Sequence, residues 1–394
     1  MLIGFTVENF RSFLCETTLS MVATSDKEHR DFNVINIVNH DDLLKNVLIY
    51  GANASGKSNL IHALHYMIKM IVSSIDVQTE HIKTCQPFTF RENAAKLPTK
   101  FEISFVLDSY MDLGIKVVYD YGFEILDGKI SREYLYKKAA RRTLVFERTA
   151  PEFDSISLTK CMEDVEPLKK NVRDDVLFLS WAAFANNALA INIVNWIAKG
   201  LIIFGLNGKG EAVPKTISDF AQSFVRKADS DILGMDMRPS GNIVSSHKVY
   251  SEDWNTNQTV ELPFAEYASE GTKRMYNLSD AFSKAVEESA VIIIDEMDLH
   301  LHPALVRYLI ALINSIEHNP HHAQLICTTH DVLLLDEDIR RDQVWFVDKD
   351  ERSVSSLYAL SDFKDVRKNS DILKRYLLGV YGAIPNLNRG NGYE

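Results

Sequence analysis

Several features that mark specialised proteins are scarce or absent in this chain of 394 residues. It has only four cysteines and no C-x-x-C pair, which argues against a disulfide-stapled scaffold and a cysteine zinc site. Reduced thiols of this kind are typical of the cytoplasm, so the sequence predicts a cytoplasmic protein. A secretory signal is not expected, because Glu8 and Arg11 interrupt the apolar run near the N-terminus. We also find no internal repeat, no low-complexity tract and no long heptad run.

Basic residues are fewer than acidic ones. The chain has 43 Lys and Arg against 54 Asp and Glu, which gives a formal net charge of −11. The acidic total excludes a chain coated in positive charge, although a local basic groove could lie within it. Nucleic acid therefore stays open as a partner.

One run without charge, residues 176–198, is long enough to span a bilayer. Its four asparagines would each need a partner in hydrocarbon, so we expect a buried helix in a soluble lobe and no membrane association.

The pattern of apolar residues predicts an α/β protein with two kinds of sheet. Alternation through residues 98–149 indicates an antiparallel meander. Residues 161–230 are mostly helical in pattern, and we interpret this block as an insertion. In the last third of the chain, strand and helix patterns alternate, which predicts a largely parallel sheet covered on both faces. These changes of pattern divide the chain into residues 1–149, 150–239 and 240–394.

The strongest single motif is a phosphate-binding loop. Residues 51–58 read GANASGKS and match G-x-x-x-x-G-K-[ST], directly after an apolar strand and directly before an amphipathic helix. The glycines let backbone N–H groups curl around phosphate oxygens, and the helix start adds partial positive charge. Lys57 is expected to reach the β- and γ-phosphates, and the Ser58 hydroxyl to ligate Mg²⁺. The expected nucleotide contacts are Gly51, Asn53, Ala54, Ser55, Gly56, Lys57, Ser58 and Asn59.

Two carboxylates end the apolar strand VIIIDE, as expected where a central parallel strand points acids from its C-terminal edge. Asp295 is placed to hold the Mg²⁺ shell, and Glu296 is the candidate general base that polarises an attacking water. Asp298 follows two residues later. The next apolar strand, QLICTT, ends just before His330, which is therefore expected to face the same crevice. Solvated acids and a structural histidine are the alternative interpretation of these positions.

Together these motifs resemble the ABC-type ATPase head shared by SMC, RecF and OLD-family proteins. The distinguishing feature of that class is a signature serine and glycine that open the helix before the acidic strand, here Ser269 and Gly271 in ASEGTKR. The resemblance implies an α/β P-loop NTPase of ABC-ATPase type, with an antiparallel β lobe and an inserted helical subdomain. In terms of the three segments, it implies an N-terminal ATPase lobe with the P-loop and meander, a helical insertion, and a C-terminal ATPase lobe with the signature, the acidic strand and the histidine.

The same resemblance implies ATP and Mg²⁺ as cofactors and a homodimer or higher homo-oligomer. Ser269 and Gly271 of one copy would cap the γ-phosphate held by the other, with Asp298 in the loop between the two sites and His330 as the γ-phosphate switch. Arg11, in NFRSF, resembles the arginine region near the nucleotide, and Gln86 is the candidate lid-loop glutamine. The implied metal ligands are Ser58, Asp295 and Gln86, and the implied catalytic residues are Lys57, Glu296 and His330.

The departures from the class narrow the expected function. Long coiled-coil arms are missing, and the part of the chain after His330 is too short for a second catalytic domain. The tail segments RRDQVWFVDKD and YGAIPN resemble the stand-alone ATPases of bacterial phage-defence and abortive-infection operons, such as the RloA and AbiLi proteins. Those are typically encoded beside a separate effector. We therefore expect an ATP-hydrolysing sensor or regulatory subunit that dimerises around ATP and controls a separate nuclease or toxin.

Two alternatives stay open. One is a RecF-like repair ATPase that grips DNA, which requires a basic strip where this chain offers only pairs. The other is a nucleotide-gated scaffold that binds ATP and scarcely hydrolyses it. The basic pairs are Lys137-Lys138, Arg141-Arg142, Lys169-Lys170 and Arg340-Arg341.

Overall fold

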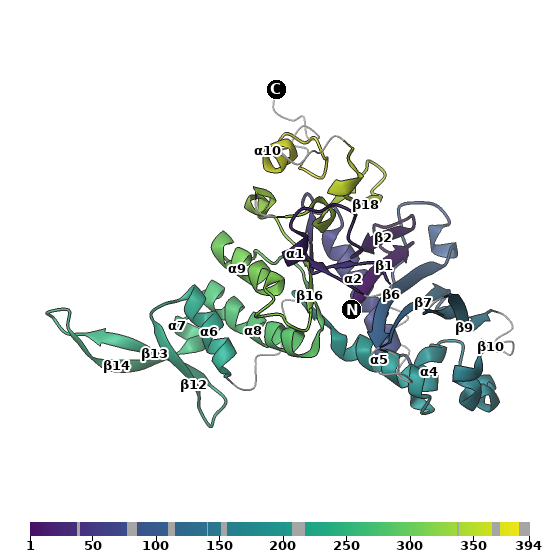
Figure 1. The fold of residues 1–394 in the computed structure, drawn as a ribbon, viewed down its shortest axis with the longest axis horizontal. Helices are drawn as coiled ribbons and strands as arrows, with labels where there is room; N and C mark the ends of the chain where they lie inside the picture. The colour runs from purple at the N-terminus through teal and green to yellow at the C-terminus, as the bar shows by residue number, and fades with distance from the viewer. Residues whose placement is uncertain are drawn as a thin grey trace.

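The apolar runs of the last third pair with the strand before the GANASGKS loop to form one sheet (Figure 1). The computed structural model describes residues 1–37, 40–76, 85–108, 115–139, 141–150, 156–206, 217–336, 339–364 and 371–385. The sheet has the order β11-β15-β16-β5-β17-β18. Neighbouring strands are parallel except β17 and β18, which are antiparallel. The strands are β11 (Leu201–Phe204), β15 (Val291–Ile294), β16 (Gln324–Thr328), β5 (Asn46–Tyr50), β17 (Val344–Lys349) and β18 (Ser355–Ala359).

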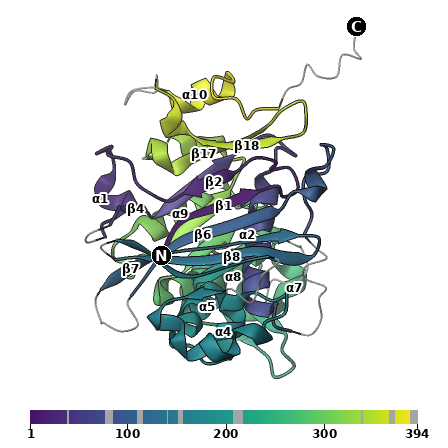
Figure 2. The same cartoon turned by 90° about the vertical axis from the view of Figure 1, so that its right-hand side faces the viewer.

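A second, antiparallel sheet confirms the expected meander and extends it with the N-terminal hairpin. Its order is β10-β9-β8-β7-β6-β1-β2. Asp127 and Gly128 both have positive φ at the tight turn between β7 and β8, a conformation that suits the right-handed twist of a hairpin. Figure 2 looks onto this sheet. The strands are β1 (Leu2–Glu8), β2 (Thr17–Ser20), β6 (Thr99–Asp108), β7 (Lys116–Leu126), β8 (Lys129–Lys138), β9 (Arg142–Thr149) and β10 (Ser157–Leu158).

Helices cover both faces of the parallel sheet, and β5 shows how. Val47 and Ile49 face a core shared with helix α2 and the antiparallel sheet, whereas Leu48 and Tyr50 face a core shared with helices α8 and α9. Strands buried on both faces are continuous apolar runs rather than alternating ones, which explains the VIII and LICT segments. The α/β P-loop architecture is therefore confirmed. The helices are α2 (Lys57–Ser73), α8 (Glu270–Glu288), α9 (Pro303–Asn314) and α10 (Ile372–Leu377).

The uncharged run at 176–198 differs from its prediction, because it forms two helices, α4 (Phe178–Phe184) and α5 (Ala188–Gly200), rather than one. The first helix ends with Ala185 as its C-cap, and Asn187 caps the second, since its side-chain oxygen accepts a hydrogen bond from the Ala190 N–H at 2.9 Å. Both helices are packed in the core beside α2. Among the described residues, no helix has the length and apolar character needed to cross a membrane.

We expected residues 161–230 to be mostly helical, and within that block β11 instead forms one edge of the parallel sheet. Beyond it, α6 (Asp219–Ala228) packs against α8 and supports a three-stranded sheet that protrudes from the body (Figure 1). The division at residues 149 and 239 stays a prediction. The protruding sheet is formed by β12 (Ile232–Met237), β13 (Ile243–Tyr250) and β14 (Thr256–Pro263), and α7 (Phe264–Tyr267) joins it to α8.

Short elements complete the described chain. Two small strands pair with each other beside the first short helix, and the other elements of this group are 3-10 helices. They are α1 (Arg30–Asn33), β3 (Val34–Ile35), β4 (Leu43–Leu44), η1 (Ala94–Lys96), η3 (Lys160–Asn171), η4 (Val332–Asp336), η5 (Arg341–Gln343) and η6 (Leu360–Asp362).

Candidate functional site

The GANASGKS loop joins the end of β5 to the start of α2, as the motif requires. A Cβ atom on Gly51 would lie 2.4 Å from the Val347 carbonyl oxygen, so only glycine fits there. Gly56 has a φ of 121°, which side-chain-bearing residues rarely adopt. Lys57 reaches back over the loop, and its Nζ donates hydrogen bonds to the carbonyl oxygens of Gly51 and Ala52 at 2.8 and 3.1 Å.

The loop opens into a cleft of about 1170 Å³. Loop residues 51–55 line one wall, including Asn53, Ala54 and Ser55, and His330 lies in the same cleft. Most of the other lining residues come from the C-terminal part of the chain, and our sequence analysis did not predict them. The sequence did contain one indication of this. VWFVDKD has the pattern of a further parallel strand, and the C-terminal end of such a strand lies at the same edge of the sheet as the loop. These missed lining residues are Val332, Asp348, Lys349, Asp350, Tyr376, Leu377, Gly382, Ala383, Ile384 and Pro385.

Asp295 and Glu296 follow β15, and both are held by one hydroxyl group at the end of β16. Thr328 Oγ1 donates to Asp295 Oδ1 at 2.6 Å and accepts a hydrogen bond from the Glu296 N–H at 2.7 Å. Glu296 has a φ of 51°, an uncommon backbone conformation, and its side chain is exposed. Asp295 is buried. The turn therefore presents one sheltered and one accessible carboxylate, as the predicted division between metal binding and base catalysis requires.

Electrostatic interactions show that the predicted catalytic groups lie near one another. Burial lowers the pKa of Lys57, and the carboxylates of Asp295, Glu296 and Asp298 oppose that shift. Burial, followed by the charge of Lys57, lowers the pKa of His330, and the same three carboxylates oppose it. The backbone N–H of His330 also donates to Asp298 Oδ1 at 3.1 Å. One lysine, three acids and one histidine are thus gathered at the C-terminal edge of the sheet.

The signature residues lie at the start of α8. Ser269 is the N-cap, and its exposed side chain accepts a hydrogen bond from the Thr272 N–H at 3.1 Å. A Cβ atom on Gly271 would lie 2.6 Å from the His300 carbonyl oxygen, which excludes any side chain there. Neither Ser269 nor Gly271 is among the residues that line the cleft of its own chain. A role toward a second copy stays a prediction.

Arg11, Asn59 and Gln86 come together beside the first turn of α2. The Arg11 guanidinium donates to Asn59 Oδ1 at 3.4 Å, and the Arg11 backbone N–H donates to the Gln86 carbonyl oxygen at 2.8 Å. Burial lowers the pKa of Arg11. The Gln86 side chain is exposed, and its assignment as a metal ligand stays a prediction.

A magnesium site cannot be read from clustered acids alone, because the described residues contain no group of three or more His, Cys, Asp and Glu arranged for a metal. Mg²⁺ prefers oxygen ligands, however, and in phosphate sites it usually keeps several waters and takes only one or two protein ligands beside the substrate phosphates. The Ser58 hydroxyl and the Asp295 carboxylate supply oxygens of that kind. The donor set therefore fits a magnesium nucleotide better than a dedicated protein cage.

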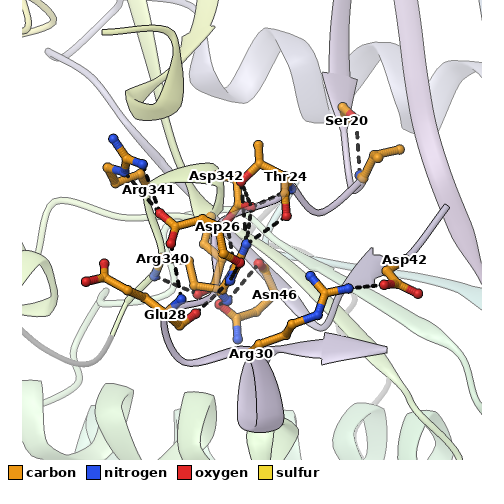
Figure 3. A network of polar contacts seen from close by, with 12 residues as sticks. Ser20, Thr24, Asp26, Glu28, Arg30, Asp42, Asn46, Arg340, Arg341 and Asp342 are labelled. Atoms are coloured by element: carbon orange, nitrogen blue, oxygen red, sulfur yellow. Dashed lines mark hydrogen bonds and ion pairs between the residues drawn. The ribbon is translucent and has the colours of Figure 1, made fainter. Parts of the chain in front are cut away.

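The basic pairs named for a DNA strip are largely used in structural contacts. The Arg340 side chain is fully buried, donates to Asp342 Oδ1 at 3.0 Å, and also binds the carbonyl oxygens of Asp26 and Glu28 (Figure 3). Arg341 pairs with Asp26 at 2.9 Å. Two other members of the pairs, Arg142 and Lys169, are also engaged with carboxylates, at Asp120 and Glu166.

Comparisons with known proteins give a family match and two similar solved structures. A family model described as "AAA domain, putative AbiEii toxin, Type IV TA system" matches residues 47–336. Among solved structures, the SMC head domain from Thermotoga maritima is 13% identical, with 91% of this chain and 98% of that chain covered at a TM-score of 0.41. The SmcHead bound to the C-winged helix domain of ScpA is 16% identical, with 91% and 97% covered at a TM-score of 0.42. No curated protein matches the chain.

Proposed function

This chain belongs to the AAA-domain ATPase family that its residues 47–336 match, and from that membership we propose that it is an ATP-hydrolysing regulatory subunit of a bacterial anti-phage defence system. In this proposal two copies dimerise around ATP in the cytoplasm and control a separate effector, a nuclease or toxin. The family description names a toxin of a type IV toxin–antitoxin system, which supports a partnership of this kind. The observation that carries the proposal is the gathering of Lys57, Asp295, Glu296 and His330 beside the loop.

Each of these groups has a defined task in ATP hydrolysis. Lys57 now bonds to two loop carbonyls, and a triphosphate would offer its ammonium group a stronger, charged partner. Ser58 and Asp295 would hold Mg²⁺, which neutralises charge on the phosphates. Glu296, exposed and fixed by its backbone, would accept a proton from the attacking water.

His330 and the signature residues would act on the γ-phosphate from two sides. Because its pKa is lowered, His330 is largely neutral at pH 7 and can donate a hydrogen bond without adding a permanent positive charge. Ser269 and Gly271 of the second copy would close the other side of the site. ATP then stabilises the closed dimer because each ATP is contacted by both copies. Hydrolysis removes part of these contacts and so weakens the dimer.

Glu296→Gln tests the catalytic part of this proposal. We expect ATP turnover to fall by about 100-fold or more, because loss of a general base typically costs 10²- to 10⁴-fold. ATP binding should persist, and light scattering should show ATP-dependent dimers that no longer dissociate. Glu288→Gln, at an exposed position near the end of α8, is the matched control and should behave as wild type. Unchanged turnover in Glu296→Gln would favour the nucleotide-gated scaffold instead.

The effector part needs a separate experiment. Affinity purification of the Glu296→Gln protein with ATP, followed by mass spectrometry, should recover one chain in stoichiometric amount. A protein that purifies alone, binds duplex DNA and shows DNA-stimulated turnover falling steeply with salt would support the RecF-like alternative. The structural use of Arg340 and Arg341 in buried or half-buried ion pairs weighs against that outcome.

A further inference from the structure

The strand that completes the parallel sheet touches the phosphate-binding loop through its first residue. Ser355 opens β18 and is only 2% exposed. Its hydroxyl donates a hydrogen bond of 2.5 Å to the carbonyl oxygen of Ser55. Its backbone N–H donates to the carbonyl oxygen of Ser12 at 2.7 Å. One residue of the C-terminal hairpin therefore joins the loop to the N-terminal turn.

Both glycines of the loop pack directly on the hairpin formed by β17 and β18. A Cβ atom on Gly51 would lie 2.4 Å from the Val347 carbonyl oxygen in β17. A Cβ atom on Gly56 would lie 2.4 Å from Ser355 Oγ in β18 and 2.9 Å from Ser12 Oγ. Since close-packed atoms leave no space for independent movement, the path of the loop depends on the position of the hairpin.

The hydrogen bond from Ser355 also orients a peptide group of the loop. The carbonyl of Ser55 and the N–H of Gly56 belong to the same peptide, and in a planar trans peptide these two groups point in opposite directions. With the carbonyl oxygen held by Ser355, the Gly56 N–H points to the other side of the loop. Loops of this kind bind phosphate through their backbone N–H groups. The orientation of this donor is therefore set by Ser355.

The same contact extends into α2. Asn59 Nδ2 donates to Ser12 Oγ at 2.8 Å, and Arg11 donates to Asn59 Oδ1. Ser355 thus stands in a hydrogen-bonded chain that includes the N-terminal turn and the first turn of the helix after the loop. Displacement of β18 would remove the loop's contact with Ser355 and the hairpin's bond to Ser12 together.

We propose that Ser355 is a positioning residue for the nucleotide site and holds the peptide between Ser55 and Gly56 in the orientation that binds phosphate. The inference rests on the proposed ATPase function and deepens it, because it makes ATP affinity depend on a strand outside residues 47–336. A partner that pulled β18 away from the loop would lower the affinity of the site for nucleotide.

Ser355→Ala tests the proposal in the full chain. We expect the Kd for magnesium ATP, measured by calorimetry, and the KM for ATP to rise roughly tenfold, the loss of about one buried hydrogen bond. The value of kcat should change by less than about threefold, because no group that touches the reacting atoms is altered. Ser356→Ala is the matched control, since Ser356 is exposed on the same strand, and it should leave both constants unchanged.

Ser355→Cys keeps the test decisive if the alanine variant does not fold. A thiol keeps a polar atom at this position, but it is larger than the hydroxyl and a weak hydrogen-bond donor, so the same loss of ATP affinity is expected. A folded Ser355→Ala or Ser355→Cys protein with wild-type Kd and KM would overturn the proposal and leave the ATPase function standing. Wild-type protein that bound no magnesium ATP would overturn both.

Discussion

The hydroxyl of Thr328 serves two carboxylate-bearing residues at once, and this shows how the active turn is set at the scale of single residues. It donates to the Asp295 side chain and accepts from the Glu296 backbone, and it is fully buried. The sequence predicted the two acids and a strand, QLICTT, that ends just before His330. It could not assign the hydroxyl a partner, because that contact exists only after β15 and β16 pair with Ile294 opposite Cys327.

Thr328→Val should therefore impair catalysis more than folding. Valine keeps the branched shape but leaves the Asp295 carboxylate and the Glu296 N–H without this partner, and the bond to the charged carboxylate alone contributes about 1.5 to 3 kcal/mol. We expect kcat to fall by roughly 10- to 100-fold. Thr328→Ser retains the hydroxyl and should keep most of the activity. Steady-state kinetics of both variants would measure this, and equal values of kcat would refute the positioning role of Thr328.

At the scale of elements, one buried carboxylate ties the antiparallel sheet to α4. Glu133, in β8, accepts hydrogen bonds from Arg148 Nε and the Tyr121 hydroxyl, both at 2.9 Å. It also accepts from the N–H groups of Phe178 and Leu179, the first two residues of α4, at 2.7 and 2.9 Å. A helix start leaves such N–H groups without partners inside the helix, so the strand side chain supplies the cap that α4 lacks.

Glu133→Gln should destabilise the fold by about 3 to 5 kcal/mol, because it leaves the Arg148 charge buried without its counter-ion. The neighbouring ion pair of Arg132 with Glu147 is partly exposed, and Arg132→Ala should cost less than about 1 kcal/mol. Urea unfolding monitored by circular dichroism would compare the two. A Glu133→Gln protein as stable as the arginine variant would contradict this account of the cap.

Some strands were predicted from the sequence and one was missed, and the length and periodicity of each apolar run explain the difference. The strands of the meander and the strands at 291–294 and 324–328 have clear periodicity or long apolar runs, and all were predicted. The strand LIIF at 201–204 was missed, because a four-residue apolar run that directly follows a helix cannot be separated from it by periodicity. The motif residues were predicted to gather in one place, whereas nothing in the sequence of residues 376–385 indicates that they line the cleft, because their position depends on tertiary contacts.

At the scale of the whole molecule, several histidines share one electrostatic tendency. For each of them, burial lowers the pKa below its ordinary value of about 6.5, and a nearby cation lowers it further. The unfolded chain therefore takes up protons at a higher pH than the folded chain does. These residues are His62, His65, His322 and His330.

This difference predicts the direction of the pH dependence of stability. Their contribution is fully present above the unfolded pKa of about 6.5, and it is lost as the pH falls from there through the lowered pKa values of the folded state. The free energy of unfolding should be smaller at pH 5.5 than at pH 7.5. Urea unfolding at the two pH values would measure this, and His322→Gln should reduce the difference. Greater stability at pH 5.5 would show that these histidines gain partners on folding instead.

The position of the β17–β18 hairpin has a practical consequence for anyone who expresses this protein. A gene fragment trimmed to the boundaries of the recognised domain, residues 47–336, would omit that hairpin together with the N-terminal strands. It would also sever the link in which Gln324 bonds both the N–H and the carbonyl of Leu2. Such a fragment would retain every motif predicted to be catalytic, yet an inactive preparation of it would not test the activity of the full chain.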